Sequence, residues 1–529
     1  MVACSGVTEP ASPDPTSVAN PTSSPVPESD NPWWVGDDKI TLKALGHISS
    51  LYVDVKDYNE ILGIQEFSKK TNLYFEWEMT NDENEKEQIN LSFASKKMPD
   101  IFTHFLSVNA VKYGSQGALI DLLPLIKEHG PNIMKALEAD PVTLPLYTTA
   151  EGNLYMIPQI DEDYRLSSFK TMVIQKAWLD KLDLKVPTTP DEFYIVLKAF
   201  KDHASELTSE KIIPYTSYFS GGIEGWFNTF SWAFGMYGAK GYEKDGKIVF
   251  GAFEPEFRET MAFIQKLYSE GLIDEDLDAN KDDPTFEAKM TNNRVGIAYV
   301  GQGRIGTYNQ KAGATFDAYE FIPMIPLEDK EGQVRYGGVG PLAHNTPAMS
   351  ISINNEYPAE TIKAWDWFFS DEGKTMMNLG IEGDTFNKVD GKVIYTDKIM
   401  KDPNLNANQA LLKYISPLYE WPCARIYDFE RAQLGPVLAE YKDNMQSLGA
   451  LDGVKTFALN TLPISEEQVK NFATLEADVN TFVDESLVKF IRGDWNLEAD
   501  YDSFNAQLKS MNIDEYISTL NEGYAKLTE

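Results

Sequence analysis

Cysteine and histidine are scarce in this 529-residue chain, which contains only Cys4, Cys423 and five histidines. A bridge between the two cysteines would tie an N-terminal tail to a folded domain, so we expect no disulfide framework. The histidines show no H-E-x-x-H or paired spacing, and there is no G-x-S-x-G motif. No run approaches the roughly 20 apolar residues of a membrane-spanning helix. These absences disfavour a disulfide scaffold, a zinc protease, a serine hydrolase and a membrane-spanning chain.

Basic residues are also few, with 47 Lys and Arg against 81 Asp and Glu, so the net charge is −34. Phosphate binding needs clustered Lys and Arg, so we expect no nucleic-acid partner. The same charge weakly disfavours a polyanionic ligand, although a local basic pocket could override it. The simplest reading is an acidic surface that keeps a secreted protein soluble.

The N-terminus has the features of an anchored tail. Val2-Ala3-Cys4-Ser5 resembles the end of a bacterial lipobox, although no charged and apolar signal region precedes it. Residues 5–32 are dense in Pro, Ser and Thr, a composition that stays disordered because it buries little apolar surface. We therefore predict a lipidated Cys4 on a tether (residues 1–36), and an extracellular monomer held to the membrane of a Gram-positive bacterium only by this anchor.

A strand–helix alternation opens the folded part. Residues 40–45 and 73–79 have strand character, and residues 99–102 open a third strand that ends in residues 103–105. Residues 58–70 and 85–95 between these strands have helical spacing. This order predicts a parallel sheet covered by helices, whose ligands lie beyond the carboxyl ends of the strands. The loops at residues 46–50, which include His47, and at residues 103–107, which begin with Thr103 and His104, are therefore candidate walls of a binding site.

Residues 148–203 show a second organising pattern. Strands are expected at 154–157, ended by Pro158, and at 171–174, with an acidic connector (Asp161, Glu162, Asp163) between them. Thr189-Pro190-Asp191-Glu192 then predicts a helix start, with a Thr cap, Pro at the first position and Glu three residues after the cap.

This stretch, with its pattern W-L-D-K-L-x-L-x-x-P-x-T-x-x-E, resembles the inter-lobe hinge of extracellular solute-binding proteins that serve ABC importers, in the sugar and oligosaccharide branch. Residues 358–373 (P-x-x-x-I-K-x-W-D-W-F-F-S-D-E-G) resemble the helix after that family's second crossover. Residues 378–386 resemble its G-x-E-G loop, and residues 490–527 resemble its closing helices.

The resemblance implies an α/β protein with a two-lobed, type II periplasmic-binding-protein-like fold, hinge crossovers and a cleft between the lobes. It implies a binding protein, not an enzyme, that closes over a carbohydrate and delivers it to the permease subunits of an ABC transporter. We expect lobe 1 to comprise residues 37–160 and 345–385, and lobe 2 to comprise residues 161–344 and 386–529.

Aromatic residues are concentrated between Trp226 and Tyr237. Flat rings stack on the C–H faces of sugars, so Trp226 and Trp232 are candidate ligand contacts, although helical spacing equally allows core packing. The loops, the hinge and the resemblance give further candidate ligand contacts. They are Thr103, His104, Asp163, Tyr164, Gln302, Glu382, Tyr419 and Trp421.

We expect no cofactor and no metal. Gly301 to Gly306 matches G-x-G-x-x-G, but the match is isolated, and we interpret it as a strand end whose backbone N–H groups face a ligand. Residues 202–214 lack the calcium ligands that some relatives carry there. A peptide-binding protein of the same fold remains an alternative. A surface glycoside hydrolase or lyase, with Glu382 and Asp384 as its acids, is another.

Overall fold

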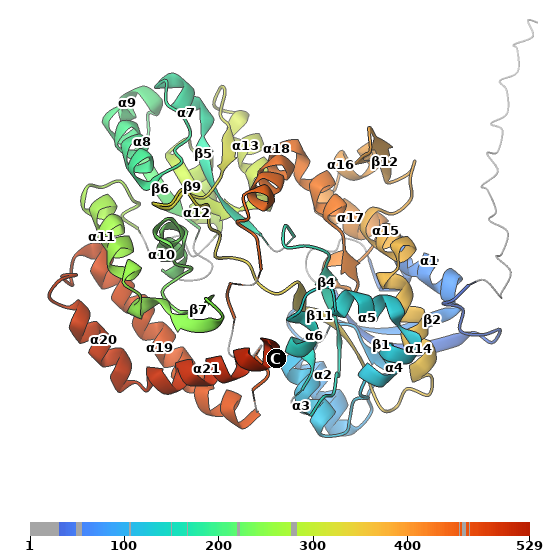
Figure 1. Cartoon of the computed structure of the whole chain (residues 1–529). Helices are drawn as coiled ribbons and strands as arrows, with labels where there is room; N and C mark the ends of the chain where they lie inside the picture. Colours follow the sequence, from blue (N-terminus) through green and yellow to red (C-terminus); the bar gives the residue numbers. More distant parts are fainter. Residues whose placement is uncertain are drawn as a thin grey trace, which may run out of the picture.

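The computed structural model describes residues 31–48, 55–104, 107–149, 151–166, 168–218, 223–276, 283–453, 455–457, 462–464 and 466–528. The chain has two lobes, each built on its own sheet and joined by connecting segments (Figure 1). Among the described residues, no helix is long and apolar enough to cross a membrane. Cys4 and residues 5–30 of the predicted tether lie outside the described residues.

The first lobe contains a six-stranded sheet in the order β14-β4-β11-β3-β1-β2. β1 pairs in parallel with β2 and β3, and β11 pairs antiparallel with β3 and β4. The parallel strands and helices expected at the start of the chain are confirmed. The strands are β1 (Ile40–His47), β2 (Leu73–Thr80), β3 (Ile101–Phe102), β4 (Ile157–Asp161), β11 (Ala343–Ile351) and β14 (Ala424–Arg425).

We expected Pro158 to end a strand over residues 154–157, but it lies inside β4, which begins at Ile157. Its partner on β11 is Ala348, at the point where the pairing register shifts between His344 and Ala348. A proline has no N–H to donate, so it is tolerated where a ladder of hydrogen bonds is already interrupted.

Helices α1 (Leu62–Thr71), α2 (Glu85–Ser95), α14 (Pro358–Trp365) and α15 (Asp371–Leu379) belong to this lobe. Its core is rich in aromatic rings: Trp365 stacks on Trp421 with centroids 5.2 Å apart, and Phe67 stacks on Phe368 at 4.4 Å.

One predicted boundary needs correction. Residues 386–529 were all expected in the second lobe, but buried residues from Phe386 to Phe429 belong to the core of the six-stranded sheet. They include β12 (Phe386–Val389), β13 (Lys392–Tyr395) and α17 (Ala407–Tyr414). The first lobe therefore extends beyond residue 385. The other limits stay predictions.

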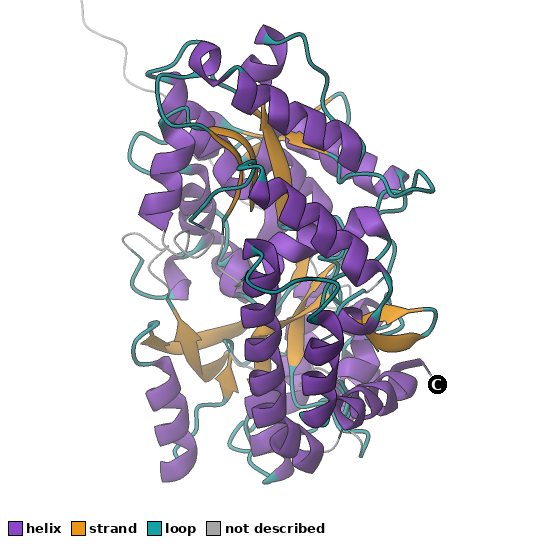
Figure 2. Cartoon of the chain, turned by 90° about the vertical axis from the view of Figure 1, so that its left-hand side faces the viewer, coloured by secondary structure: helices purple, strands orange, loops and turns teal. Residues whose placement is uncertain are grey.

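The second lobe contains a four-stranded sheet in the order β10-β5-β9-β6. β9 pairs in parallel with β6 and antiparallel with β5. Figure 2, which faces this lobe, shows its strands flanked by long helices. The strands are β5 (Lys170–Gln175), β6 (Ile213–Ser217), β9 (Val295–Gly301) and β10 (Phe321–Met324); the helices include α8 (Pro190–Asp202), α10 (Glu224–Ser231), α11 (Glu256–Ser269), α19 (Glu466–Arg492), α20 (Tyr501–Ser510) and α21 (Ile513–Thr528).

Three segments of the described chain connect the lobes: residues 162–166 with 168–169, residues 325–342, and α18 (Tyr427–Ser447), which is kinked at Gly435. Phe429, near the start of α18, belongs to the first core, and Tyr441 and Met445, near its end, belong to the second. The three segments are hydrogen-bonded to one another where they leave the first sheet. The Asp161 N–H donates to the Leu342 carbonyl at 2.9 Å, and the Glu162 N–H donates to the Arg425 carbonyl at 2.9 Å. These segments form a common hinge.

The topology turns the same edge of each sheet toward this hinge. β4 leaves the first sheet at the carboxyl end of β1 and β3, because β11 is antiparallel to both β3 and β4. β5 enters the second sheet beside the carboxyl ends of β6 and β9, since Lys170 pairs with Gly301. The carboxyl edges of both sheets therefore border the crossovers, as ligand-binding edges of α/β sheets do.

Candidate functional site

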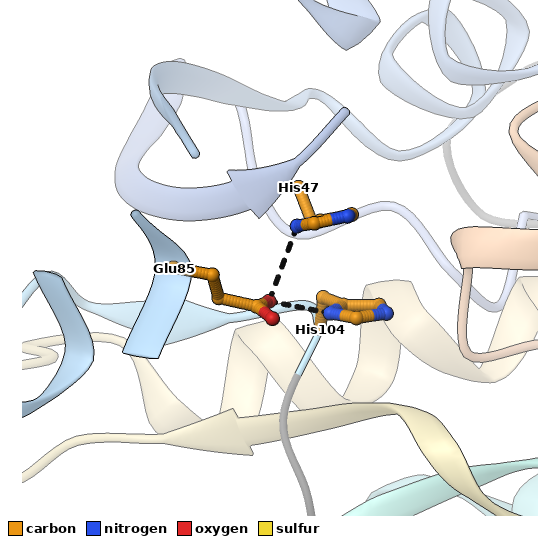
Figure 3. Close-up of side chains that lie close together, drawn as sticks. All are labelled: His47, Glu85 and His104. Atoms are coloured by element: carbon orange, nitrogen blue, oxygen red, sulfur yellow. Dashed lines mark hydrogen bonds and ion pairs between the residues drawn. The ribbon is translucent and has the colours of Figure 1, made fainter. Parts of the chain in front are cut away.

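The edge of the first sheet carries a compact polar cluster (Figure 3). His47 ends β1, His104 follows β3, and Glu85 begins α2. The two imidazole rings are stacked, with centroids 4.3 Å apart and an angle of 16° between them. Nδ1 of His104 contacts Oε1 of Glu85, and Nδ1 of His47 lies 3.4 Å from the same oxygen. Thr103, predicted to touch a ligand, is instead fully buried, and its N–H donates to the Leu45 carbonyl.

The first crossover contains Asp163 and Tyr164, both half-buried. Arg165 binds the Asp163 carboxylate at 2.7 Å and that of Asp443, on α18, at 2.9 Å. Its guanidinium also lies 3.8 Å from the ring centre of Tyr427. Burial, with the nearby Asp140 carboxylate, raises the pKa of Tyr164, which therefore stays a neutral hydroxyl. Arg165 thus links the first crossover to α18, and the charge of Asp163 is paired within its own crossover.

Two buried ion pairs hold the same region. Arg425 Nε lies 2.6 Å from Oδ1 of Asp161, and the side chains are 7% and 0% exposed. Lys442 Nζ lies 2.7 Å from a carboxylate oxygen of Glu430. Burial raises the pKa of Glu430 and lowers that of Lys442, and in each case the partner's charge opposes the shift. The Asp161–Arg425 pair joins the ends of β4 and β14, whereas the Glu430–Lys442 pair lies within α18. Lys442 Nζ also donates to the Arg165 carbonyl at 2.7 Å, which holds α18 against the first crossover.

The edge of the second sheet contains an exposed aromatic ring. Phe169, immediately before β5, is 51% exposed. We predicted that backbone N–H groups of the glycine-rich turn would face a ligand. The Gln302 N–H instead donates to the Phe169 carbonyl at 2.9 Å and is not available to a ligand. The Gln302 amide and the Tyr336 hydroxyl both donate to the Lys170 carbonyl, and Trp232 packs on Tyr336 at 4.9 Å. Gln302, predicted as a ligand contact, is thus buried in this network, and Trp232 packs on another member of it.

Several predicted contacts lie in the cores instead. Trp226 and Trp421 have no exposed surface, and Trp232 is 3% exposed, so in this conformation none of them can stack on a ligand. Tyr419 is half-buried, and its hydroxyl donates to Gln433 at 3.0 Å. Glu382 is exposed in the turn between α15 and β12.

Sequence reasoning missed Glu85 and Phe169, and it placed His47 in a candidate wall loop without naming it as a site residue. His47 and His104 are far apart in sequence and meet only because β1 and β3 are neighbours. Phe169 follows the acidic connector, where a lone aromatic residue carries no pattern. The predicted strand ends and the predicted crossover could have identified these residues, because ligands of α/β sheets bind at the carboxyl ends of the strands.

Comparison with known families gives a match over residues 57–375 to the family described as bacterial extracellular solute-binding protein. Among characterised proteins, the chain is 25% identical over 520 residues to the fructooligosaccharide ABC transporter substrate-binding protein FusA of Streptococcus pneumoniae, covering 92% of this chain and 90% of that protein. It is also 25% identical over 343 residues to the polygalacturonan/rhamnogalacturonan-binding protein YtcQ of Bacillus subtilis, covering 62% and 64% of the two chains.

Solved structures share the fold. The alginate-binding protein AlgQ2 without calcium ion superposes with a TM-score of 0.68 at 24% identity, over 93% of this chain and 99% of that one. FusA of S. pneumoniae in complex with kestose gives a TM-score of 0.67 at 23% identity, over 92% and 99%. The predicted two-lobed fold is confirmed by these neighbours.

Proposed function

This chain belongs to the bacterial extracellular solute-binding proteins, and we propose that it captures an oligosaccharide between its two lobes and delivers it to an ABC importer. The observation that carries this proposal is that the carboxyl edges of both sheets meet at one hinge. The exposed ring of Phe169 lies at the edge of the second sheet. An aromatic face suits the apolar face of a sugar, and neighbouring polar groups suit its hydroxyls.

Capture by hinge closure follows from the layout. A ligand that touches both edges stabilises the arrangement in which they approach, because only that state makes both sets of contacts. Phe169 supplies the stacking surface from the second lobe, and His104, whose side chain is 19% exposed, supplies a polar group from the first. The paired hinge segments guide the movement, and the permease binds the closed form.

We infer a neutral oligosaccharide as the ligand. The relatives named above bind fructooligosaccharide, polygalacturonan or rhamnogalacturonan, and alginate, which points to glycans longer than a monosaccharide. The net charge of −34 disfavours the acidic members of this set. Binding without turnover is part of the proposal: Asp384 pairs with Lys398 at 2.7 Å, so the Glu382/Asp384 pair is poorly suited to glycosidic acid–base chemistry.

The same proposal places the protein outside the cell as a monomer, tethered by a lipid on Cys4 to the membrane of a Gram-positive bacterium. The lipobox-like sequence and the Pro/Ser/Thr-rich residues 5–32 support this location. Labelling of the natively expressed protein with a clickable fatty acid, compared between the wild type and Cys4→Ala, tests the anchor independently of ligand binding.

A thermal-shift screen tests the function. The panel contains fructooligosaccharides, oligogalacturonides, alginate oligomers and short peptides, with product analysis for every hit. A ligand at about 100 times its Kd adds about 2.7 kcal/mol to the free energy of unfolding and raises Tm. We expect a shift with a neutral glycan, which is recovered intact. A shift with acidic glycans alone would refute the neutral ligand class, a shift with peptides alone would refute the carbohydrate assignment, and glycan turnover would refute the binding role.

A further inference from the structure

We propose that His47, Glu85 and His104 bind a divalent transition-metal ion of the zinc type at the carboxyl edge of the first sheet. Two imidazoles and one carboxylate form a donor set that zinc favours, whereas calcium and magnesium prefer oxygen ligands. The three ligand atoms lie within 4.8 Å of one another. Two ligand atoms of a tetrahedral zinc ion lie about 3.4 Å apart, because the Zn–N distance is about 2.0–2.1 Å. Atoms that are at most 4.8 Å apart therefore need to approach each other by no more than about 1.4 Å.

Asp82 gives an independent reason for this assignment. Its carboxylate lies 3.1 Å from Nε2 of His47, which therefore carries the proton of the neutral ring. Nδ1 of His47 is then a lone-pair acceptor, buried without a hydrogen-bond partner, in a residue that is 3% exposed. A carboxylate that orients a histidine from behind in this way is characteristic of metal ligands.

Without a cation the cluster is electrostatically unfavourable. The Nδ1 lone pair of His47 faces Oε1 of Glu85 at 3.4 Å, so two acceptors point at each other. One metal ion between the three side chains accepts both lone pairs and removes this conflict.

The cluster is accessible and leaves a position open. The side chains of His104 and Glu85 are 19% and 23% exposed, which gives an ion access to the cluster. Three protein ligands leave a fourth tetrahedral position for water or another oxygen ligand. The metal proposal depends on these side chains alone and stands whether or not the ligand is a carbohydrate.

The test uses the full chain after treatment with a chelator. Zinc is titrated in competition with a chromophoric chelator, and cobalt(II) is added separately to record its visible absorption bands. We expect one zinc ion per chain and the intense bands of tetrahedral cobalt. Loss of an outer carboxylate costs about 10–100-fold in affinity, so Asp82→Asn should fall in this range, and His104→Gln or Glu85→Gln should lose about 100-fold or more.

His203→Gln is the matched control. His203 Nδ1 lies 2.7 Å from Oε1 of Glu206, but this pair is exposed and offers only two donors, so zinc affinity should not change. Circular dichroism confirms that each variant is folded, and the cobalt spectrum of the wild type decides the matter if the variants are not. The proposal is overturned if the wild type gives neither saturable zinc binding nor tetrahedral cobalt bands, or if folded His104→Gln and Glu85→Gln both bind zinc as the wild type does.

Discussion

Phe169 is the most exposed aromatic residue of the part of the chain that the structure describes. It lies where the first crossover enters the second sheet. Replacing it with alanine removes a stacking surface worth about 0.5–1.5 kcal/mol beyond its buried area, so glycan affinity should fall about tenfold. Titration calorimetry measures this with the glycan selected in the thermal-shift screen.

Tyr357→Ala serves as the control for this variant, because Tyr357 is 42% exposed but caps α14 on the first lobe. It should bind glycan like the wild type. Equal affinity for Phe169→Ala and Tyr357→Ala would remove Phe169 from the site.

Asp161 makes the other residue-scale claim, because its carboxylate neutralises the buried guanidinium of Arg425. In Asp161→Asn, a charge stays buried without its partner, and such changes cost about 3–5 kcal/mol. Urea unfolding monitored by fluorescence should show a loss of this size. Asp384→Asn breaks the pair with Lys398, whose side chains are 47% and 40% exposed, and should cost less than about 1 kcal/mol. Similar losses for both variants would contradict the hinge role of the Asp161 pair.

Helix α8 illustrates structure that is specified locally. The Thr189 side chain accepts a hydrogen bond from the Glu192 N–H at 3.3 Å, as the Thr-Pro-Asp-Glu pattern predicts. Thr189→Ala should lower the free energy of unfolding by about 1 kcal/mol, whereas Thr189→Ser keeps the oxygen and should stay close to the wild type. Chemical denaturation of the three proteins checks this; equal losses for both variants would show that the methyl group, not the cap, matters.

The second crossover contains a turn built around one carboxylate. Oδ1 of Asp329 accepts the N–H groups of Glu331 and Gln333, both at 2.9 Å, and Oδ2 accepts from Arg335 at 2.8 Å. Burial raises the pKa of Asp329, but these hydrogen bonds outweigh it, and the pKa lies below its usual value. Because the folded-state pKa is depressed, the stabilisation is present above the unfolded-state pKa and is lost as pH falls through the folded-state pKa.

Asp329→Asn should therefore be less stable than the wild type at neutral pH, and the difference should shrink below about pH 4, the ordinary aspartate pKa. Urea midpoints measured from pH 7 to pH 3 follow the two proteins. A difference that is constant with pH would show that the carboxylate charge does not stabilise the turn.

These elements also show what sequence reasoning can and cannot reach. The cap at Thr189 depends on neighbours within one turn and was predicted. The stacking of His47 on His104 depends on which strands are adjacent and was not. Trp226 and Trp421 were predicted as ligand contacts but are buried. The spacing of aromatic residues in the sequence is the same for a core residue as for one that stacks on a sugar. Exposure, which separates the two roles, is decided by the packing of distant segments.

At the scale of the whole molecule, the two lobes and their crossovers were predictable because alternating strands and helices and the hinge pattern are regular. The placement of Phe386 to Phe429 in the first lobe was not, since it follows from core packing across the hinge. We propose that the whole molecule works by closing the edges of its two sheets over one ligand.

Small-angle X-ray scattering with and without the selected glycan tests that account most directly. We predict that a saturating glycan lowers the radius of gyration, because ligand contacts from both edges draw the lobes together. A peptide that gives no thermal shift should leave it unchanged. If the glycan binds with full occupancy and the radius of gyration does not change, capture by closure of the lobes is contradicted.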